Sequence, residues 1–340
     1  MQHQNNQKNG ARRKIRWLAT LGSALLCTAI APSLTWAQAQ KWPSQPLRVI
    51  VPYPAAGAAD IAARIVGQRL SQRLGQPIVI DNHPGAVGSI ATSIVAKAAP
   101  DGYTLLAATN PEITIVRHLR RTLPYNPDTD LIPLLRTANA PIVLVARGQD
   151  GQFVDFKSLL DQARANPNKL TYATPGIGTP MHLMMESILK ETGVKIHHIP
   201  YNGGTRAMAD LIGGQVNVLA ITLSTVAGQI KSGRVKALAM LQAERSPVAP
   251  EVPTLREAGG VTVLNLPSVW FAWFAPVNTP PAILRRLSTE LKLIASEPAV
   301  QEAFRQAGLE PLIVEPPRLN QLLREESEFF SRASKPFAEQ

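Results

Sequence analysis

Two loops rich in glycine, proline and alanine carry the residue types best suited to binding an anion. The first, Tyr53 to Asp60 (YPAAGAAD), follows an apolar stretch over Leu47 to Val51. The second, Pro175 to Pro180 (PGIGTP), follows a shorter apolar stretch over Thr171 to Ala173. Each loop leads into a segment of helical periodicity, so each is expected to end at a helix N-terminus. Unpaired backbone N–H groups and the positive end of the helix dipole make such a junction a site for a carboxylate.

We therefore expect the two loops, one from each of two lobes, to face each other across a cleft. Their small side chains let a ligand approach the main chain. Asn110 is a further candidate because it lies just after an expected strand, Thr104–Ala108. Ligands bind beyond the carboxyl ends of parallel strands. The candidate ligand-binding residues are Tyr53, Pro54, Ala55, Ala56, Gly57, Asp60, Asn110, Gly176, Gly178, Thr179, His182 and Tyr201.

Several of these candidates have a second interpretation. Asp60 stands where a helix cap or first-turn acid belongs, a role that needs no ligand. Gly178 and Thr179 open the main chain at a helix start, although an ordinary turn has the same composition. His182 either hydrogen-bonds ligand or water, or is a packed ring that braces its loop. Trp270, Phe271, Trp273 and Phe274 are predicted to be mainly core, with a stacking platform for the ligand as the second interpretation.

Catalytic motifs are missing from the sequence. It has no Gly-x-Ser-x-Gly elbow, no Walker lysine and no dinucleotide-binding Gly-x-Gly-x-x-Gly after a strand. His197 and His198 are adjacent on an expected strand and point to opposite faces, so they cannot chelate one metal together. We expect no catalytic residues, no metal and no cofactor. An enzyme acting on a small carboxylate is the alternative that a search for turnover would reveal.

The N-terminus has the pattern of an export signal. Five basic residues precede an uncharged apolar run from Trp17 to about Ala31, and small residues follow at Ala37 and Ala39. Residues 1–39 are therefore predicted to be a cleavable signal peptide, which places the mature protein in the periplasm. The Arg12-Arg13 pair leaves the twin-arginine route open beside the Sec route.

Removing this segment changes the charge and the cysteine content. The formal charge falls from +11 to 11 − 5 = +6, because the segment holds five basic residues and no acidic one. The remaining excess is spread along the chain without interleaved aromatics, which argues against nucleic-acid binding and suits an anionic small ligand. Cys27, the single cysteine, is lost with the signal. No thiol chemistry is then expected.

Strand and helix signals alternate along the mature chain, which predicts an α/β fold with crossover helices. We expect a two-lobed, type II-like periplasmic binding protein fold with two mainly parallel sheets joined by a two-strand hinge. Lobe 1 is expected to comprise residues 40–145 plus 267–340, and lobe 2 residues 146–266. Ser268–Ala275 is expected to return to lobe 1, and the helices after it are expected to have no strand of their own. A short element is expected at Val261–Leu264.

Short motifs across the mature chain identify a family. They are VPYPA (Val51–Ala55), GQP (Gly75–Pro77), DNHPGA (Asp81–Ala86), PDGYTLL (Pro100–Leu106), LPYN (Leu123–Asn126), GIGT (Gly176–Thr179) with His182-Leu183, HIPY (His198–Tyr201), GQV (Gly214–Val216), VPT (Val252–Thr254) with Glu257-Ala258-Gly259, and Ala275-Pro276 with Thr279-Pro280. In this order they resemble the periplasmic solute receptors of tripartite tricarboxylate transporters, called Bug receptors.

The resemblance implies a ligand carboxylate held by backbone groups and ordered water between residues 53–60 and 176–182. It also implies delivery to a membrane permease; a receptor serving a sensor kinase of a two-component system is the alternative. We expect a monomer.

Three positions depart from the family pattern. Ala56-Gly57-Ala58 replaces Gly-Gly-Ser or Gly-Gly-Thr, which removes a hydroxyl but keeps the backbone donors. Ile221 stands where the family commonly has an acid that could meet an ammonium group, and Ala272 replaces a usual glycine. The departures favour an uncharged or aromatic ligand body that bears a carboxylate over an amino acid.

Overall fold

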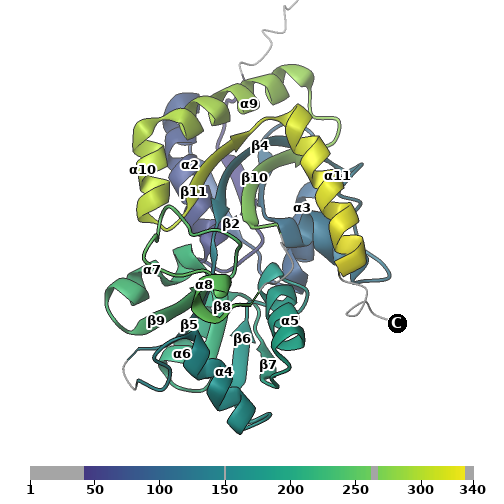
Figure 1. The fold of residues 1–340 in the computed structure, drawn as a ribbon. Coiled ribbons are helices and arrows are strands. Elements are labelled where there is room, and N and C mark those ends of the chain that lie inside the picture. Colours follow the sequence, from purple (N-terminus) through teal and green to yellow (C-terminus); the bar gives the residue numbers. More distant parts are fainter. Residues whose placement is uncertain (1–41, 149–150, 262–266, 334–340) are drawn as a thin grey trace, which may run out of the picture. The chain divides into compact units, whose positions relative to one another are not determined.

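The computed structural model describes residues 42–148, 151–261 and 267–333 (Figure 1). The chain from Pro43 onward forms one compact unit. The predicted signal peptide lies outside the described residues. Within them, no helix is both long and apolar enough to cross a membrane.

The described residues form two mixed β-sheets. The six-stranded sheet has the order β11-β4-β10-β3-β1-β2, and the five-stranded sheet has the order β7-β6-β8-β5-β9. The strands of the first sheet are β1 (Leu47–Val51), β2 (Ile78–Asn82), β3 (Thr104–Ala108), β4 (Leu131–Ala140), β10 (Val269–Pro276) and β11 (Glu310–Val314). Those of the second are β5 (Ile142–Arg147), β6 (Thr171–Thr174), β7 (His197–Pro200), β8 (Val218–Thr222) and β9 (Val235–Met240). We call the first sheet with its helices lobe 1 and the second lobe 2.

The prediction of mainly parallel sheets is wrong. In lobe 1, β1 is parallel to β2 and β3, whereas β10 runs antiparallel to β3 and β4, and β11 antiparallel to β4. In lobe 2, β6 is parallel to β7 and β8, whereas β5 runs antiparallel to β8 and β9. The sheets are mixed because the strands that follow a change of sheet, β5 and β10, run against the parallel strands beside them.

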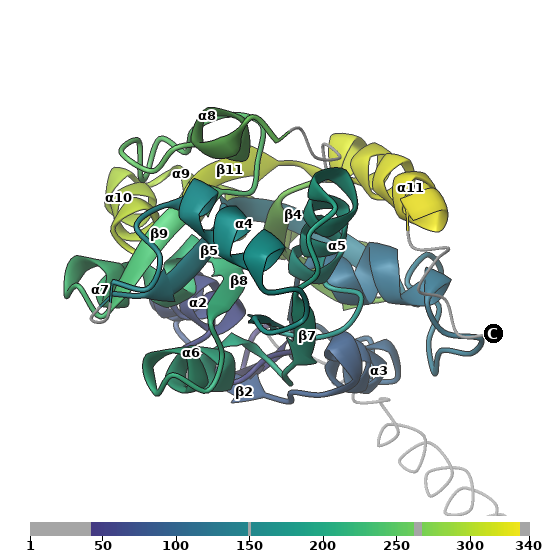
Figure 2. The same cartoon turned by 60° about the horizontal axis from the view of Figure 1, so that its bottom comes forward.

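Helices cover both sheets, and three of the described helices of lobe 2 begin at a side-chain cap. For example, the Asp155 carboxylate accepts from the Ser158 backbone N–H at 2.7 Å in a capping box. The helices of lobe 1 are α2 (Ala58–Leu74), α3 (Ser89–Ala96), α9 (Pro281–Ser296), α10 (Pro298–Gln306) and α11 (Pro316–Ala333), with short turns η1 (Ala86–Gly88), η2 (Pro111–Ile115) and η3 (Val116–His118). Those of lobe 2 are α4 (Phe156–Ala165), α5 (Pro180–Thr192), α6 (Gly204–Ile212), α7 (Leu223–Lys231) and α8 (Leu255–Gly259). Figure 2, in which lobe 2 comes forward, shows α4, α5, α6 and α7 around the second sheet.

Each lobe has its own apolar core. The core of lobe 1 includes Ile50, Leu106, Trp270 and Phe274, and that of lobe 2 includes Val143 and Leu219 among its strand residues. The aromatic residues of β10 are buried, which confirms their predicted place in the core. The indole N–H of Trp270 also donates to Glu326 on α11 at 2.7 Å, so this helix is tied to the sheet by a buried polar contact.

The chain changes sheet at Pro141, and not after Val145 as predicted. Residues Ile142 to Ala146 pair with β8, so β5 belongs to the second sheet. The last residue of β4, Ala140, pairs with the first residue of β10, Val269. The strands by which the chain leaves and re-enters the first sheet are therefore neighbours, as in a two-strand hinge.

The sequence prediction omitted β4 and β11. The helices after β10 do have a strand of their own, since β11 lies between α10 and α11 and pairs with β4. Both strands contain a proline, Pro133 or Pro311, and β11 is an edge strand, where proline is tolerated but the sequence pattern is weak. Most of the short element predicted at Val261–Leu264 lies outside the described residues.

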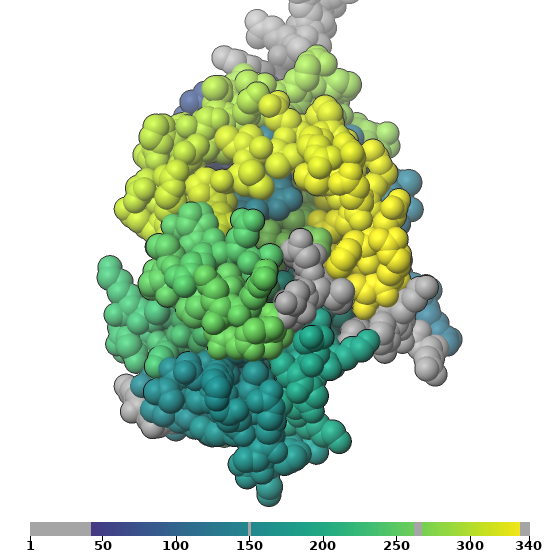
Figure 3. Space-filling model, viewed as in Figure 1, coloured from purple at the N-terminus to yellow at the C-terminus, as the bar shows by residue number. Residues whose placement is uncertain are grey.

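The lobes touch each other away from the two loops. Ser246 donates a hydrogen bond to Glu310 on β11 at 2.6 Å. A Cβ built on Gly308 would lie 3.2 Å from the backbone of Ser224 on α7. The space-filling view shows this side, with the green surface of lobe 2 directly beneath the yellow surface of the C-terminal elements (Figure 3).

Candidate functional site

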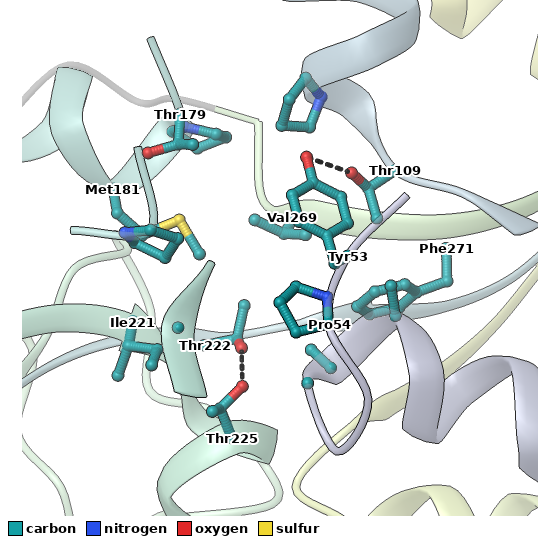
Figure 4. Close-up of a pocket in the computed structure, with 17 residues that line it drawn as sticks. Tyr53, Pro54, Thr109, Thr179, Met181, Ile221, Thr222, Thr225, Val269 and Phe271 are labelled. Carbon is teal, nitrogen blue, oxygen red and sulfur yellow. Dashed lines mark hydrogen bonds between the residues drawn. The ribbon is translucent and has the colours of Figure 1, made fainter. Parts of the chain in front are cut away.

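An inner cavity of about 60 Å³ lies between the lobes. Both predicted loops contribute to its wall, the first through Gly57 and Ala58 and the second through Thr179 and Pro180 (Figure 4). The two loops therefore meet at one cavity. Its lining residues are Tyr53, Pro54, Gly57, Ala58, Ala59, Thr109, Pro111, Pro175, Thr179, Pro180, Met181, Gly204, Ile221, Thr222, Thr225, Val269 and Phe271.

Helix starts converge on this cavity from both lobes. The first turns of α2, α5, α6 and α7 all contribute lining residues. The N-cap residues of α2, α6 and α7, which are Gly57, Gly203 and Thr222, accept no side-chain hydrogen bond from a backbone N–H of the first turn. The amides of those turns therefore keep the capacity to bind an anion, and the helix dipoles add positive potential at the same place.

The remaining wall of the inner cavity is apolar or carries hydroxyl groups. Ile221, Val269 and Phe271 supply apolar surface, and the Thr222 and Thr225 hydroxyls lie 3.0 Å apart (Figure 4). No acidic or basic side chain is among the lining residues, all of which lie in the described part of the chain. Apolar walls with a few fixed polar groups are typical of small-molecule sites.

An outer cavity of about 540 Å³ adjoins the inner one. The two share Tyr53, Pro54, Pro175 and Thr179, so they lie next to each other, and we refer to them together as the cleft. The outer cavity is otherwise lined by the loop after β2, by the end of η3 and by the loop after β7. These residues are Pro84, Gly85, Ala86, Val87, Gly88, Val116, Leu119, Arg120, Gly176, Ile177, Pro200, Tyr201, Asn202 and Gly203.

A buried carboxylate stands behind the tyrosine shared by both cavities. The Tyr53 hydroxyl donates to Glu112 at 3.1 Å, and the Thr109 hydroxyl donates to the same oxygen at 2.9 Å. The Thr109 backbone N–H donates to the other carboxylate oxygen. Burial raises the pKa of Glu112 to about 7, and the hydrogen bonds only partly oppose this. Glu112 thus fixes the Tyr53 ring at the cleft.

Asp60 supports the first loop from behind. It is buried and accepts hydrogen bonds from the Ala56 N–H at 2.9 Å, from Arg64 at 2.9 Å and from Asn82 at 3.1 Å. Burial alone raises the pKa of Asp60, but these hydrogen bonds outweigh burial and lower it. Asp60 lines neither cavity, and neither do Ala55 and Ala56, which are exposed. Asp60 is an acid in the first turn of α2, which matches the interpretation that needs no ligand.

Asp60→Asn is expected to lower the free energy of unfolding by about 1 kcal/mol and to weaken ligand binding a few-fold. The asparagine side chain cannot form the ion pair with Arg64. Its neutral oxygen is also a weaker acceptor than a carboxylate for the Ala56 N–H, so the backbone at Ala56 is held less firmly. Denaturant unfolding and calorimetric titration measure the two effects. Arg64→Gln is the matched control, because it removes the half-exposed partner and leaves the Ala56 contact in place. Equal effects in both variants would show that only the ion pair matters.

His182 and Gly178 lie beside the cavities and not in their walls. His182 is buried, its Nδ1 accepts from the Gly178 backbone N–H at 3.2 Å, and its ring stacks on His198 at 4.4 Å. Burial lowers the pKa of His182. The geometry matches the bracing interpretation, in which the ring holds the second loop.

Asn110 lies outside the cleft, whereas Tyr201 lines it. Asn110 is fully buried and donates to Glu326 at 2.9 Å and to the Ser268 carbonyl at 3.2 Å, so it links β3 to α11 and lines neither cavity. Tyr201 lines the outer cavity, and its hydroxyl donates to Asp210 at 2.7 Å. Of the predicted residues, Tyr53, Pro54, Gly57, Gly176, Thr179 and Tyr201 line the cleft.

Two glycines of lobe 2 touch lobe 1 at the cleft. Gly178, at φ 79°, would place a Cβ 2.0 Å from Leu119, and Gly203, at φ 104°, would place one 2.7 Å from the ring of Pro54. Both backbone conformations favour glycine. Glycine at the two positions lets the lobes approach closely. The presence of glycine at position 178 is therefore explained without a ligand contact.

The sequence reasoning missed several lining residues. Thr222 ends β8 and Thr225 lies in the first turn of α7, at a further strand-to-helix junction of the same kind, and this signal was available. Arg120 and the loop after β2 had no such signal. In that loop Val87 has φ 54°, which is unusual for a β-branched residue and marks a strained turn at the cleft. In the described ranges no cluster of three metal-ligating side chains occurs.

Comparisons with known proteins identify the family. The family model for the tripartite tricarboxylate transporter family receptor matches residues 62–334. The periplasmic binding protein BugD is 31% identical with a TM-score of 0.80, over 87% of this chain and 98% of BugD. Rpa4515 of R. palustris, solved with adipate, is 31% identical with a TM-score of 0.82, over 86% and 97%. MatC (Rpa3494) of Rhodopseudomonas palustris, solved with bound malate, is 29% identical with a TM-score of 0.76, over 86% and 100%.

The family match spans both lobes, and all the quoted motifs except Val51–Ala55 lie within the matched residues. These relatives are solute-binding proteins and not enzymes. The chain therefore belongs to the tripartite tricarboxylate transporter receptor family of periplasmic solute-binding proteins, as its sequence motifs predicted.

Proposed function

We propose that this receptor binds a small organic carboxylate between its lobes and delivers it to the membrane permease of a tripartite tricarboxylate transporter. The observation that carries the proposal is the convergence of the first turns of α2, α5, α6 and α7 on one cavity. The family description supports the permease as partner, and the adipate and malate bound by Rpa4515 and MatC support the ligand class.

The carboxylate occupies the inner cavity. A volume of about 60 Å³ is enough for one such group, and the uncapped first turns supply backbone donors that need no rearrangement to bind it. The body of the ligand lies in the outer cavity, which at about 540 Å³ has the size of a small-molecule site. Ile221 offers no charge to an ammonium group, which disfavours an amino acid.

Binding closes the cleft. The contacts of Gly178 with Leu119 and of Gly203 with Pro54 join the lobes at its rim, so the closed form shields the bound carboxylate from water. In the open form these contacts are lost and the ligand enters. The permease then distinguishes the two forms, and export by the predicted signal, residues 1–39, places the receptor where it can do so.

The test is a titration of protein purified from the periplasm. Native mass spectrometry of this protein is expected to show a co-purified organic acid, and its mass shows whether residues 1–39 have been removed. Calorimetry with straight-chain mono- and dicarboxylates of four to ten carbons, and with aspartate and glutamate, is expected to give one-to-one binding of a carboxylate and no amino-acid binding. The same samples are examined for products. No carboxylate binding, or turnover of a bound acid, contradicts the proposal.

A further inference from the structure

Glu112 is an acid buried directly behind the inner cavity. Its side chain is fully shielded from solvent, and Pro111, which precedes it at the start of η2, lines that cavity. Two residues that donate hydrogen bonds to its carboxylate, Tyr53 and Thr109, line the same cavity. Gly88 closes another side, since a Cβ built there would lie 2.9 Å from a carboxylate oxygen of Glu112. The carboxylate is therefore one hydrogen bond away from residues in the wall of the proposed ligand site.

No positive charge is paired with this carboxylate. Within the described residues Glu112 forms no ion pair, and it accepts from neutral groups, the hydroxyls of Tyr53 and Thr109 and backbone N–H groups. Tyr125 donates to the Glu112 backbone carbonyl at 2.6 Å, and burial raises the pKa of both tyrosines, so they stay neutral. Glu326 of α11 contacts η2 at a different residue and adds no positive charge. The carboxylate thus has little to offset a second negative charge nearby.

A ligand carboxylate in the inner cavity brings such a charge. Water screens the repulsion between it and Glu112 only weakly, because the Glu112 carboxylate is buried. Proton binding by Glu112 removes the repulsion, and the new O–H can donate to the hydroxyl of Tyr53 or Thr109. That hydroxyl no longer donates to Glu112, so its hydrogen is free to donate to the ligand. Burial already raises the pKa of Glu112 to about 7, so adding the proton near neutral pH costs little free energy.

We infer that Glu112 takes up a proton when a carboxylate ligand enters the inner cavity, so that binding draws a proton from solution. This inference rests on the proposed function and concerns the control of the same site by pH. Below about pH 7, Glu112 of the unliganded protein is already protonated, and affinity is highest. Above that pH the proton must be bound together with the ligand, so affinity falls as the pH rises.

The test counts the protons that accompany binding. The probe is whichever straight-chain mono- or dicarboxylate of four to ten carbons binds wild-type protein most tightly in the titrations described above. Its calorimetric enthalpy at pH 7.5 is measured in phosphate and in Tris, because these buffers differ in ionisation enthalpy and the difference gives the number of protons bound. Wild-type protein is expected to take up about half a proton or more per ligand, and to lose about tenfold in affinity between pH 6.5 and 9. Glu112→Gln, whose side chain stays neutral, is expected to take up none and to lose about twofold at most.

Glu326→Gln is the matched control. It removes another buried acid that contacts η2 but lines neither part of the cleft, so proton uptake should persist. Thermal unfolding shows that both variants are folded, and the proton count of wild-type protein depends on neither of them. Uptake that is absent in wild-type protein, that survives in Glu112→Gln, or that is lost in Glu326→Gln overturns the inference. If no acid of the series binds, the proposed function itself fails.

Discussion

Gly203→Ala is expected to weaken carboxylate binding by about thirtyfold while the protein stays folded. The added methyl would lie 2.7 Å and 2.9 Å from two ring carbons of Pro54 in the opposite lobe. A proline ring cannot turn aside as a flexible side chain does, so the lobes must stay apart. Overpacking of this kind costs about 1–3 kcal/mol, and here that cost falls on the closed, ligand-bound form. Calorimetry measures the affinity, and small-angle X-ray scattering shows whether ligand still makes the protein more compact.

Gly193→Ala is the matched control. Gly193 also lies in lobe 2 with a positive φ of 67°, but a Cβ there meets no atom within 4 Å. Alanine is strained at both positive φ values, at Gly193 in the left-handed helical region and at Gly203 (φ 104°, ψ 164°) in a region adopted almost only by glycine, and only Gly203→Ala also obstructs the approach of the lobes. Similar affinity in the two variants would show that contact at Gly203 does not control closure.

Glu112→Gln is expected to change how the stability of the folded protein depends on pH. Burial raises the pKa of Glu112 from 4.5 to about 7. The folded state then keeps this proton after the unfolded chain has lost it, so Glu112 makes the folded state less stable as the pH rises from 4.5 to about 7. The loss is complete above that range and amounts to about 3 kcal/mol. Glutamine stays neutral, so the variant should escape this loss.

Denaturant unfolding of both proteins at intervals between pH 4.5 and 7.5 measures this difference. The free energy of unfolding of the variant minus that of the wild-type protein should grow by about 3 kcal/mol across the range. Glu326, which is also buried, is present in both proteins and cancels. Glu302→Gln, on the exposed face of α10, is the control for the loss of one carboxylate. A constant difference for Glu112→Gln would mean that the carboxylate is not destabilised by burial.

The strand-to-helix junctions were predictable because their signals are local. Glycine, proline and alanine after an apolar strand, followed by helical periodicity, place a helix start within a short span of sequence. The structure begins α2 at Ala58 and α5 at Pro180, at or near the ends of the two predicted loops. Family motifs along the chain then identified the receptor fold. Neither step requires knowledge of which segments meet in space.

The strand pairing was less predictable. The sequence reasoning omitted β4 and β11 and placed β5 in the wrong sheet. A short strand with a proline has little periodicity of its own, and its place is decided by the partner with which it pairs, as β11 pairs with β4. The direction of β5 and β10 likewise follows from the path by which the chain changes sheet, which no local pattern records.

For the site, the sequence by itself determined that two glycine-rich loops end at helix starts and can offer backbone donors to an anion. Only the tertiary structure decided that these loops share one cavity, that Arg120 lines its outer part, and that Asp60 and His182 stand behind the loops. The physical reason is the distance along the sequence over which each feature is determined. Helix ends and their dipoles arise within one turn of chain, whereas the wall of a cleft is formed by residues that are distant in sequence and are brought together by the packing of two lobes.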